Sequence, residues 1–181
     1  MGANLWLTGI LAMCLFWCVG VYNRIIRLRA RSHESFIAVA ANMHRYRALV
    51  LEHIHPSKVI ETPIAFQQLL LQLEQLDQMT KDAQACPWDK TALAVLTAAG
   101  SEVSAVWGVL RTAPADLAGA ALPDNFMQDW DANSRALQHA ISGFNQILVD
   151  YNEAIAQFPA TAITSFLGFK PAGQIAIFHE A

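Results

Sequence analysis

The first 23 residues of the chain carry no charged side chain, and four arginines follow within the next eight positions. A helix from Gly2 to Tyr22 would span about 31 Å, which is enough to cross the hydrocarbon core of a bilayer. A cleaved signal peptide needs a positively charged start and a small-x-small exit, and neither is present. A lipoprotein needs a small residue before its modified cysteine, whereas methionine and tryptophan precede the two cysteines of this run. We therefore predict that residues 1–23 form a retained transmembrane signal anchor.

The charges that flank this span predict its orientation. Lysine and arginine are enriched on the cytoplasmic side of membrane spans, and here they follow the span while none precedes it. We expect the N-terminal end of the span outside and the body in the cytoplasm, in a single-pass arrangement. Arginines that only set topology would give the same pattern as arginines that bind lipid headgroups. The residues predicted to face the membrane or its lipids are Tyr22, Arg24, Arg27, Arg29 and Arg31.

The charge balance of the body argues against nucleic acid as a partner. Beyond Arg31 the chain has 8 basic and 15 acidic side chains, although 54% of the whole chain is hydrophobic. Nucleic-acid binding depends on clustered cations that neutralise phosphates, so we predict no nucleic-acid site. The hydrophobic fraction exceeds the ~45–50% of an average soluble chain, and the anchor accounts for part of that excess.

The rest of the chain has the apolar period of α-helices and almost no alternating strand pattern. No glycine or proline interrupts Val21–His55, so the span is expected to continue without a break into the first helix. Three more helices follow, which end at the CPWD turn (86–89), before Pro114 and at Phe158-Pro159. Short connections favour antiparallel neighbours. The predicted fold class is all-α, with the transmembrane helix continuing into an antiparallel up-down four-helix bundle.

Each helix has an apolar seam expected to line the bundle core. The seam of the first helix comprises Phe36, Val39, Met43, Tyr46 and Val50. That of the second comprises Phe66, Leu69 or Leu70, Leu73 and Leu76. That of the third comprises Ala92, Val95, Ala99, Val103, Val106 and Leu110. That of the fourth comprises Phe126, Trp130, Asn133, Leu137, Ile141, Phe144, Leu148, Tyr151, Ile155 and Phe158. Asn133 is the polar exception, and we expect it to set the packing register.

The C-terminal segment is short and apolar, with no charged side chain from Ala154 to Phe169. The first and fourth helices are predicted to be the longer pair, uncovered by the others over ~12–15 Å near the membrane. We expect the tail to cover this gap through Ile163, Phe166, Leu167 and Phe169. Immersion among lipid headgroups and docking of a partner are the alternatives. The predicted domains are an anchor (1–23), a helical bundle (24–159) and an apolar tail (160–181) packed at the membrane-proximal end.

Two segments carry a resemblance to a known family. VYNRIIRLRAR (21–31), directly after one apolar span, and DYNEAIAQFPATAITSFLGFKP (150–171) resemble the start and end of LemA-family proteins, and LPDNF (122–126) also fits. The resemblance implies a bacterial inner (plasma) membrane protein with an antiparallel helical cytoplasmic body and no known catalytic activity. It also implies an accessory or membrane-organising role, since relatives occur in magnetosome membranes and family genes often lie near membrane-peptidase genes. The chain departs from the family at 42–56, where NMHRYRALVLEHIHP replaces a basic pair and an IPNL-type stretch.

The sequence contains no constellation typical of catalysis. His53 and His55, with Glu52 and His44 nearby, are the only metal-like cluster, but helical residues two apart point away from each other. Cys86 has no neighbouring base that would make it a nucleophile. No glycine-rich loop that could hold phosphates is present. We predict no catalytic, metal-binding or cofactor-binding residues, no cofactor and no enzymatic activity.

These observations predict a membrane-tethered helical-bundle scaffold or accessory protein that binds or organises membrane partners. The alternatives are a regulatory subunit of a membrane peptidase or other enzyme, and an anionic-lipid-binding protein that remodels membranes. The expected partners are the lipid bilayer and other membrane proteins, and a homo-oligomer is left open. The predicted interaction surface comprises Asn23, Tyr151, Asn152, Phe158, Pro159, Phe166, Gly168, Phe169, Lys170 and Pro171.

Overall fold

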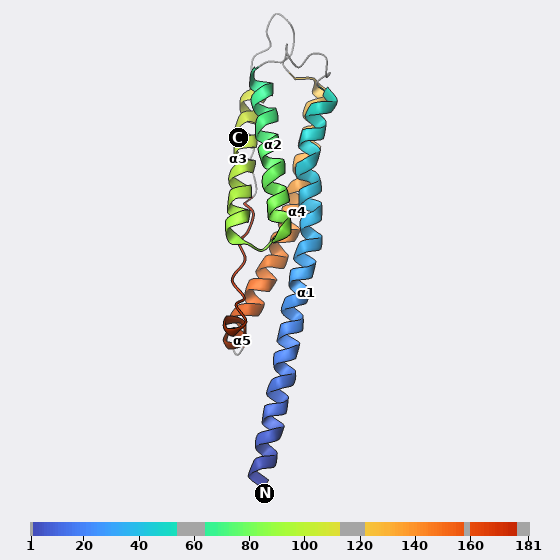
Figure 1. The fold of residues 1–181 in the computed structure, drawn as a ribbon. Coiled ribbons are helices and arrows are strands. Elements are labelled where there is room, and N and C mark those ends of the chain that lie inside the picture. Colours follow the sequence, from blue (N-terminus) through green and yellow to red (C-terminus); the bar gives the residue numbers. More distant parts are fainter. Residues whose placement is uncertain (1, 54–63, 113–121, 158–159, 177–181) are drawn as a thin grey trace, which may run out of the picture.

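The computed structural model describes residues 2–53, 64–112, 122–157 and 160–176. Four long helices and one short helix account for most of them: α1 (Gly2–His53), α2 (Ile64–Ala85), α3 (Lys90–Thr112), α4 (Asp124–Ala156) and α5 (Ala160–Phe166). The described ranges contain no strand. The predicted all-α, four-helix bundle is therefore confirmed (Figure 1), and α5 is an additional helix within the predicted tail.

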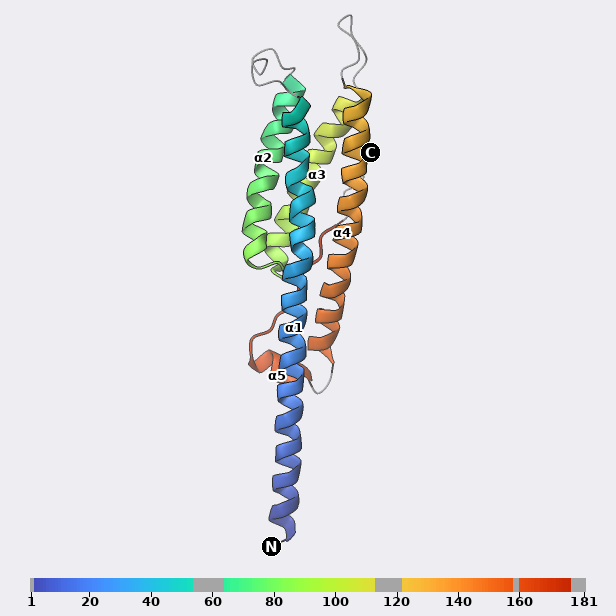
Figure 2. The same cartoon turned by 90° about the vertical axis from the view of Figure 1, so that its right-hand side faces the viewer.

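The first helix runs without interruption through 52 residues, about 78 Å at helical rise. Its N-terminal part projects beyond the other helices in both views (Figures 1 and 2). Large apolar side chains are bare there, and Trp6, Leu7 and Phe16 are 78%, 73% and 81% exposed. By length and composition alone, α1 and α3 could each span a membrane, but α3 buries its apolar side in the bundle. The exposed apolar side chains of α1 have no such cover within the described chain.

The bundle consists of two helix pairs, with α1 against α4 and α2 against α3, joined by contacts between α1 and α2. The predicted seam of α1 is buried, and so is every described member of the α4 seam. Phe158 lies outside the described residues. Asn133, buried in this seam, donates a hydrogen bond from Nδ2 to the Asn42 carbonyl at 3.0 Å, which ties α4 to α1. An unpaired amide at this depth would be costly, so the bond favours one register.

The predicted α3 seam is wrong at Val95, whereas its members Ala99, Val103 and Leu110 are buried as expected. Val95 is 45% exposed, whereas Leu93 and Leu96 are fully buried. Apolar residues occur nearly all round the start of this helix, so two adjacent seams satisfy the same helical spacing. The leucines lie in the core and Val95 on the surface, because burial of the larger leucine side chains removes more apolar surface from water.

Aromatic rings join α3 to α4 near the end of the bundle away from the N-terminus. Trp107 and Trp130 are stacked at 4.1 Å between centroids, and Phe126 meets Trp107 edge-on at 5.5 Å. Tyr46 brings α1 to the same cluster, 4.4 Å from Trp130. Burial of rings of this size removes a large apolar surface from water and stabilises this end of the bundle.

As expected, α2 and α3 are shorter than α1 and α4: α2 and α3 have 22 and 23 residues, whereas α4 has 33 and α1 has 52. Below their ends, α5 lies beside α1 and α4 (Figures 1 and 2). The chain then turns and runs back along α4 in extended form toward the start of α3. Residues 160–176 are called the tail below. Its reach to α3 was not anticipated, because the prediction kept the whole segment at the lower end.

Candidate functional site

The tail, α1, α4 and the α2–α3 turn meet around one arginine. The guanidinium of Arg29 lies over the rings of Phe169, Trp88 and Tyr151, at 4.6, 4.9 and 5.6 Å from their centroids. It also donates a hydrogen bond to the Tyr151 hydroxyl at 3.2 Å, and that hydroxyl donates to the Lys170 carbonyl at 3.0 Å. A cation held over three ring faces is attracted to their negative charge density. We call Arg29, Trp88, Tyr151 and Phe169 the foot cluster.

The foot cluster corrects one of the membrane-facing predictions. Arg29 was grouped with Arg24, Arg27 and Arg31, but only those three are exposed. Arg29 is partly buried, and its Nε is buried without a hydrogen-bond partner among the described residues. The four arginines lie within less than three turns of α1 but on different faces of it. Arg29 lies on the face against which the tail packs. Tyr22, 45% exposed, meets Phe169 edge-on at 6.3 Å and so links the cluster to the C-terminal end of the predicted anchor.

The CPWD turn places Trp88 in this cluster. Backbone bonds from Cys86 N–H to the Ala83 carbonyl and from Asp89 N–H to the Cys86 carbonyl close the turn at 3.2 and 2.9 Å. The Asp89 carboxylate then accepts the Ala92 N–H at 2.8 Å, which is an N-cap for α3. The turn is thereby locked from both sides, and Trp88 is held against α1.

Gly168 was predicted to belong to an interaction surface, but the structure shows that its role is to shape the backbone. Its φ is +72°, a conformation in which a side chain is strained. Phe169 N–H bonds to the Thr164 carbonyl at 2.9 Å and Gly168 N–H to the Ser165 carbonyl at 3.2 Å. This pair of bonds is the Schellman motif that ends a helix at a left-handed residue. The motif stops α5 and directs Phe169 back toward Arg29.

Two threonines of α5 donate hydrogen bonds to backbone carbonyls at the C-terminal end of α4. The buried Thr164 hydroxyl donates to the Ile155 carbonyl at 3.0 Å, and Thr161 donates to the Ala156 carbonyl at 2.8 Å. The last carbonyls of a helix have no partner within it, so these hydroxyls take the place of water. The uncharged tail is therefore a cap for α4 as well as an apolar cover.

Two asparagines of α4 hold the extended part of the tail. Asn152 exchanges two hydrogen bonds with the backbone of Ala172, at 2.8 and 3.1 Å, and Asn145 does the same with Ile175, at 2.7 and 3.0 Å. Seven helical residues rise about 10.5 Å and three extended residues cover about 10 Å, so both pairs fit at once. At Gly173 an added Cβ would come within 2.9 Å of Lys90 Cα, which is why the tail can approach α3 there.

Asn145 was missed from the sequence, and Asn152 was found only through the family resemblance. The signal that could have found both is their spacing of seven on one face of α4, beside a seam that is otherwise apolar. Asparagine is an uncommon choice inside a helix, because its side chain competes for backbone hydrogen bonds. Its repetition at heptad spacing points to a backbone partner.

The remaining predicted interaction residues are distributed unevenly. Phe158 and Pro159 lie outside the described residues, as do the side chains of Ile163 and Phe166. Asn23, Lys170 and Pro171 are exposed. Leu167 is 47% exposed, so its predicted part in covering the long helices is wrong. That cover comes from buried Ala172 and Ile175 and partly buried Phe169, together with Ala160 and Thr164 of α5.

A separate polar notch lies between α1 and α4 at the same end of the bundle. It is an open depression of about 460 Å³, which we call the arginine notch, and its lining residues are Arg24, Arg27, Leu28, Arg31, Asp150 and Glu153. A smaller hollow of about 210 Å³ adjoins it and shares Arg24; its other residues, Trp17, Val21, Ile25, Ala154, Gln157 and Ala160, are mostly apolar, and we call it the apolar hollow.

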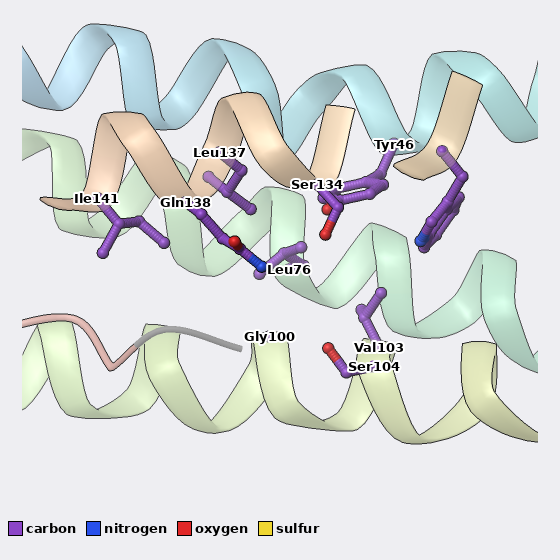
Figure 3. Close-up of a pocket in the computed structure, with 10 residues that line it drawn as sticks. Tyr46, Leu76, Gly100, Val103, Ser104, Ser134, Leu137, Gln138 and Ile141 are labelled. Carbon is purple, nitrogen blue, oxygen red and sulfur yellow. The ribbon is translucent and has the colours of Figure 1, made fainter. Parts of the chain in front are cut away.

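A cavity inside the described part of the bundle is too small for a substrate. The cavity shown in Figure 3 has a volume of about 20 Å³ and is lined mainly by α3 and α4, with Tyr46 of α1 and Leu76 of α2. Ser104 and Val103 reach it from α3, and Ser134 and Gln138 from α4. This volume accommodates roughly one water molecule. The cavity in Figure 3 is therefore a small packing defect with mostly apolar walls and a few polar groups, too small for a substrate.

Titratable groups outside the notch form one notable cluster. Asp77 of α2 pairs with His44 of α1, and with Lys81 at 2.6 Å. Burial of Asp77 alone would raise the pKa of its carboxyl, but the bonds and charges of Lys81 and His44 outweigh it and hold that pKa below 3.8. His44 thus has a structural partner. Among the described residues no group of three potential metal ligands occurs, and His55 lies outside them.

The foot cluster and the arginine notch lie where α1 leaves the bundle, and the tail runs from there along α4 to α3. They can hold the tail and offer charge to a ligand, but they combine no nucleophile with a base. A scan against models of protein families and searches of curated proteins and of solved structures find nothing that matches this chain, and the LemA resemblance stays a prediction.

Proposed function

We propose that this protein is a single-pass, membrane-tethered helical scaffold without catalytic activity of its own. In this proposal the N-terminal part of α1 spans the bacterial inner membrane, with its start outside and the bundle in the cytoplasm. The bundle end that carries the foot cluster then lies at the membrane surface, where it binds or organises membrane proteins. The resemblance of residues 21–31 and 150–171 to LemA-family proteins supports the same role.

One observation carries the proposal. The apolar part of α1 stands free of the bundle with its large side chains exposed, and exposed arginines follow it immediately. Exposed apolar surface on this scale is unfavourable in water and favourable in hydrocarbon. Arginines at one end only are the pattern of a span whose following segment is cytoplasmic.

Membrane fractionation with an alkaline carbonate wash tests the tether. We expect the chain in the washed membrane pellet, and we expect Leu11→Arg with Leu15→Arg to move it to the supernatant. Each arginine at the centre of a span costs about 2.5–3.5 kcal/mol. Both leucines are well exposed, at 62% and 60%, and lie on the part of α1 that projects beyond the bundle, so we expect the bundle to be unaffected.

Ile37→Arg is the matched control, since Ile37 is also an exposed apolar residue of α1 but lies beside the bundle. It should stay in the pellet. A wild-type chain in the wash, or a double variant that remains in the membrane, would overturn the tether. A reporter fused after residue 181 should be active only in the cytoplasm.

Photo-crosslinking in native membranes tests the scaffold role. A crosslinkable residue in place of exposed Lys170, next to the foot cluster, should capture a membrane protein. The same residue in place of exposed Asp129, at the other end of α4, should not. Equal capture at both positions, or capture at neither, would argue against a partner site at this end.

A further inference from the structure

The charged side chains that line the arginine notch do not form ion pairs with one another in the described structure. Arg27, Arg31 and Glu153 make no side-chain hydrogen bond or ion pair within the part of the chain that the structure describes. Arg24 reaches only the Gln157 amide at 3.5 Å, and Asp150 accepts only from Gln146, at 3.2 Å. Three cations from α1 and two anions from α4 thus line an open notch of about 460 Å³ without pairing across it. Such a notch suits a ligand that carries both charges.

The apolar hollow continues this site toward the N-terminus of α1. The lining residues along α1 run from Trp17 and Val21 through Arg24 to Arg27 and Arg31. Polarity therefore increases along one helix, from an apolar wall to guanidinium groups. A ligand that fills both hollows must be apolar at one end and charged at the other.

We propose that the two hollows together bind one phospholipid whose headgroup carries a phosphate and a primary ammonium. The arginines hold the phosphate, since guanidinium groups donate paired hydrogen bonds to phosphate oxygens. Asp150 and Glu153 accept from the ammonium. The upper part of an acyl chain lies against Trp17 and Val21. This rests on the proposed function, because a membrane-embedded α1 brings lipid to the site.

The depth of the site agrees with a lipid headgroup. From Arg24 to Arg31 the helix rises about 10 Å, and each headgroup layer of a bilayer is roughly 5–8 Å thick. With the apolar run in the hydrocarbon and Arg24 at its boundary, Arg27 lies about 4.5 Å further out, within the headgroup layer, and Arg31 lies just beyond that layer. The phosphate depth then falls within the notch.

The two carboxylates decide which lipid class fits. A headgroup that has a phosphate and no amine would leave Asp150 and Glu153 beside a second negative charge, which is unfavourable. A quaternary ammonium carries the positive charge but has no N–H to donate. The primary ammonium alone satisfies both sides of the notch.

Native mass spectrometry of the full chain in a non-ionic detergent tests the assignment. The probes are phosphatidylethanolamine, phosphatidylcholine and phosphatidylglycerol with identical acyl chains, and soluble phosphoethanolamine. We expect the ethanolamine lipid to be retained roughly tenfold better than the other two lipids, which corresponds to about 1.4 kcal/mol. Equal retention of the three lipids, or better retention of the glycerol lipid, would overturn the proposal. Soluble phosphoethanolamine that binds as well as the lipid would overturn the role of the apolar hollow.

Variants separate the two halves of the headgroup. Asp150→Asn with Glu153→Gln should abolish the preference for ethanolamine over glycerol, whereas Arg27→Gln with Arg31→Gln should weaken binding of both. The matched controls are Glu102→Gln with Asp129→Asn and Arg47→Gln with Arg135→Gln, all exposed and away from the notch. Equal effects in the controls would show attraction by net charge alone and defeat the proposal. A carbonate-resistant chain without lipid preference would refute only this inference, whereas a chain washed from the membrane would refute the tether.

Discussion

At the residue scale, Thr164 explains why an uncharged tail follows α4. Its hydroxyl is buried and donates to the Ile155 carbonyl at 3.0 Å. Thr164→Val keeps the shape of the side chain and leaves that carbonyl without a partner. We expect the free energy of unfolding to fall by about 1–2 kcal/mol, measured by denaturant unfolding followed through tryptophan fluorescence. Thr161→Val, which affects an exposed hydroxyl, should cost less because water can replace it; equal losses would contradict the capping role.

Arg29 holds the tail through the shape of its guanidinium as much as through its charge. Arg29→Lys keeps the charge but loses the plane that lies over Phe169, Trp88 and Tyr151. We expect faster backbone hydrogen exchange in residues 167–176, by about tenfold for a loss near 1.4 kcal/mol. Arg27→Lys, at an exposed position on the same helix, is the control. Unchanged exchange in the Arg29 variant would show that the rings hold the tail without the cation.

At the element scale, the tail is a strand-like segment bound by a helix. Asn145 and Asn152 each present a carbonyl and an amide to the tail backbone, in the manner of a neighbouring strand. Asn152→Asp keeps the acceptor for the Ala172 N–H and places a negative oxygen against the Ala172 carbonyl. We expect it to release residues 170–176, seen as faster cleavage of the tail by added protease, while circular dichroism of the bundle is unchanged.

Gln128→Glu is the matched control for that change, because it converts an exposed α4 amide to a carboxylate far from the tail. It should leave the cleavage rate as in the wild type. If the Asn152 variant is cleaved no faster than this control, the paired amides contribute little to tail binding.

At the scale of the whole molecule, acid stability reports on the α1–α2 contact. The pKa of Asp77 is lowered in the folded state, where Lys81 and His44 outweigh the effect of burial. A lowered folded-state pKa means that its stabilisation is complete above 3.8 and is lost as the pH falls through the folded value. We expect Asp77→Asn to reduce stability at neutral pH by up to about 1 kcal/mol and to flatten the decline below about pH 4.

Unfolding curves of the wild type and of Asp77→Asn between pH 2.5 and 7 measure this difference, with about half a pH unit between points. Asp129→Asn, an exposed substitution, is the control. Parallel curves for all three proteins would mean that the pair of Asp77 with His44 and Lys81 does not link protonation to folding.

The sequence alone determined the parts of this protein that depend on local pattern. Apolar spacing of three and four residues predicts the helices and most of their seams, and the absence of glycine and proline predicts the unbroken α1. The expected helix lengths predict that the first and fourth helices extend beyond the second and third. These properties follow from the period of the helix and from backbone sterics, so they can be worked out one segment at a time.

Only the tertiary structure decided which side chains meet. Arg29, predicted to face lipid, lies over three aromatic rings. The start of the α3 seam is formed by Leu93 and Leu96, in place of the predicted Val95. The tail runs back along α4, where Asn145 and Asn152 bind its backbone. Each outcome depends on what a neighbouring element, distant in sequence, offers in space. Sequence spacing gives the face on which a residue lies, but the partner on that face is set by packing of the whole chain.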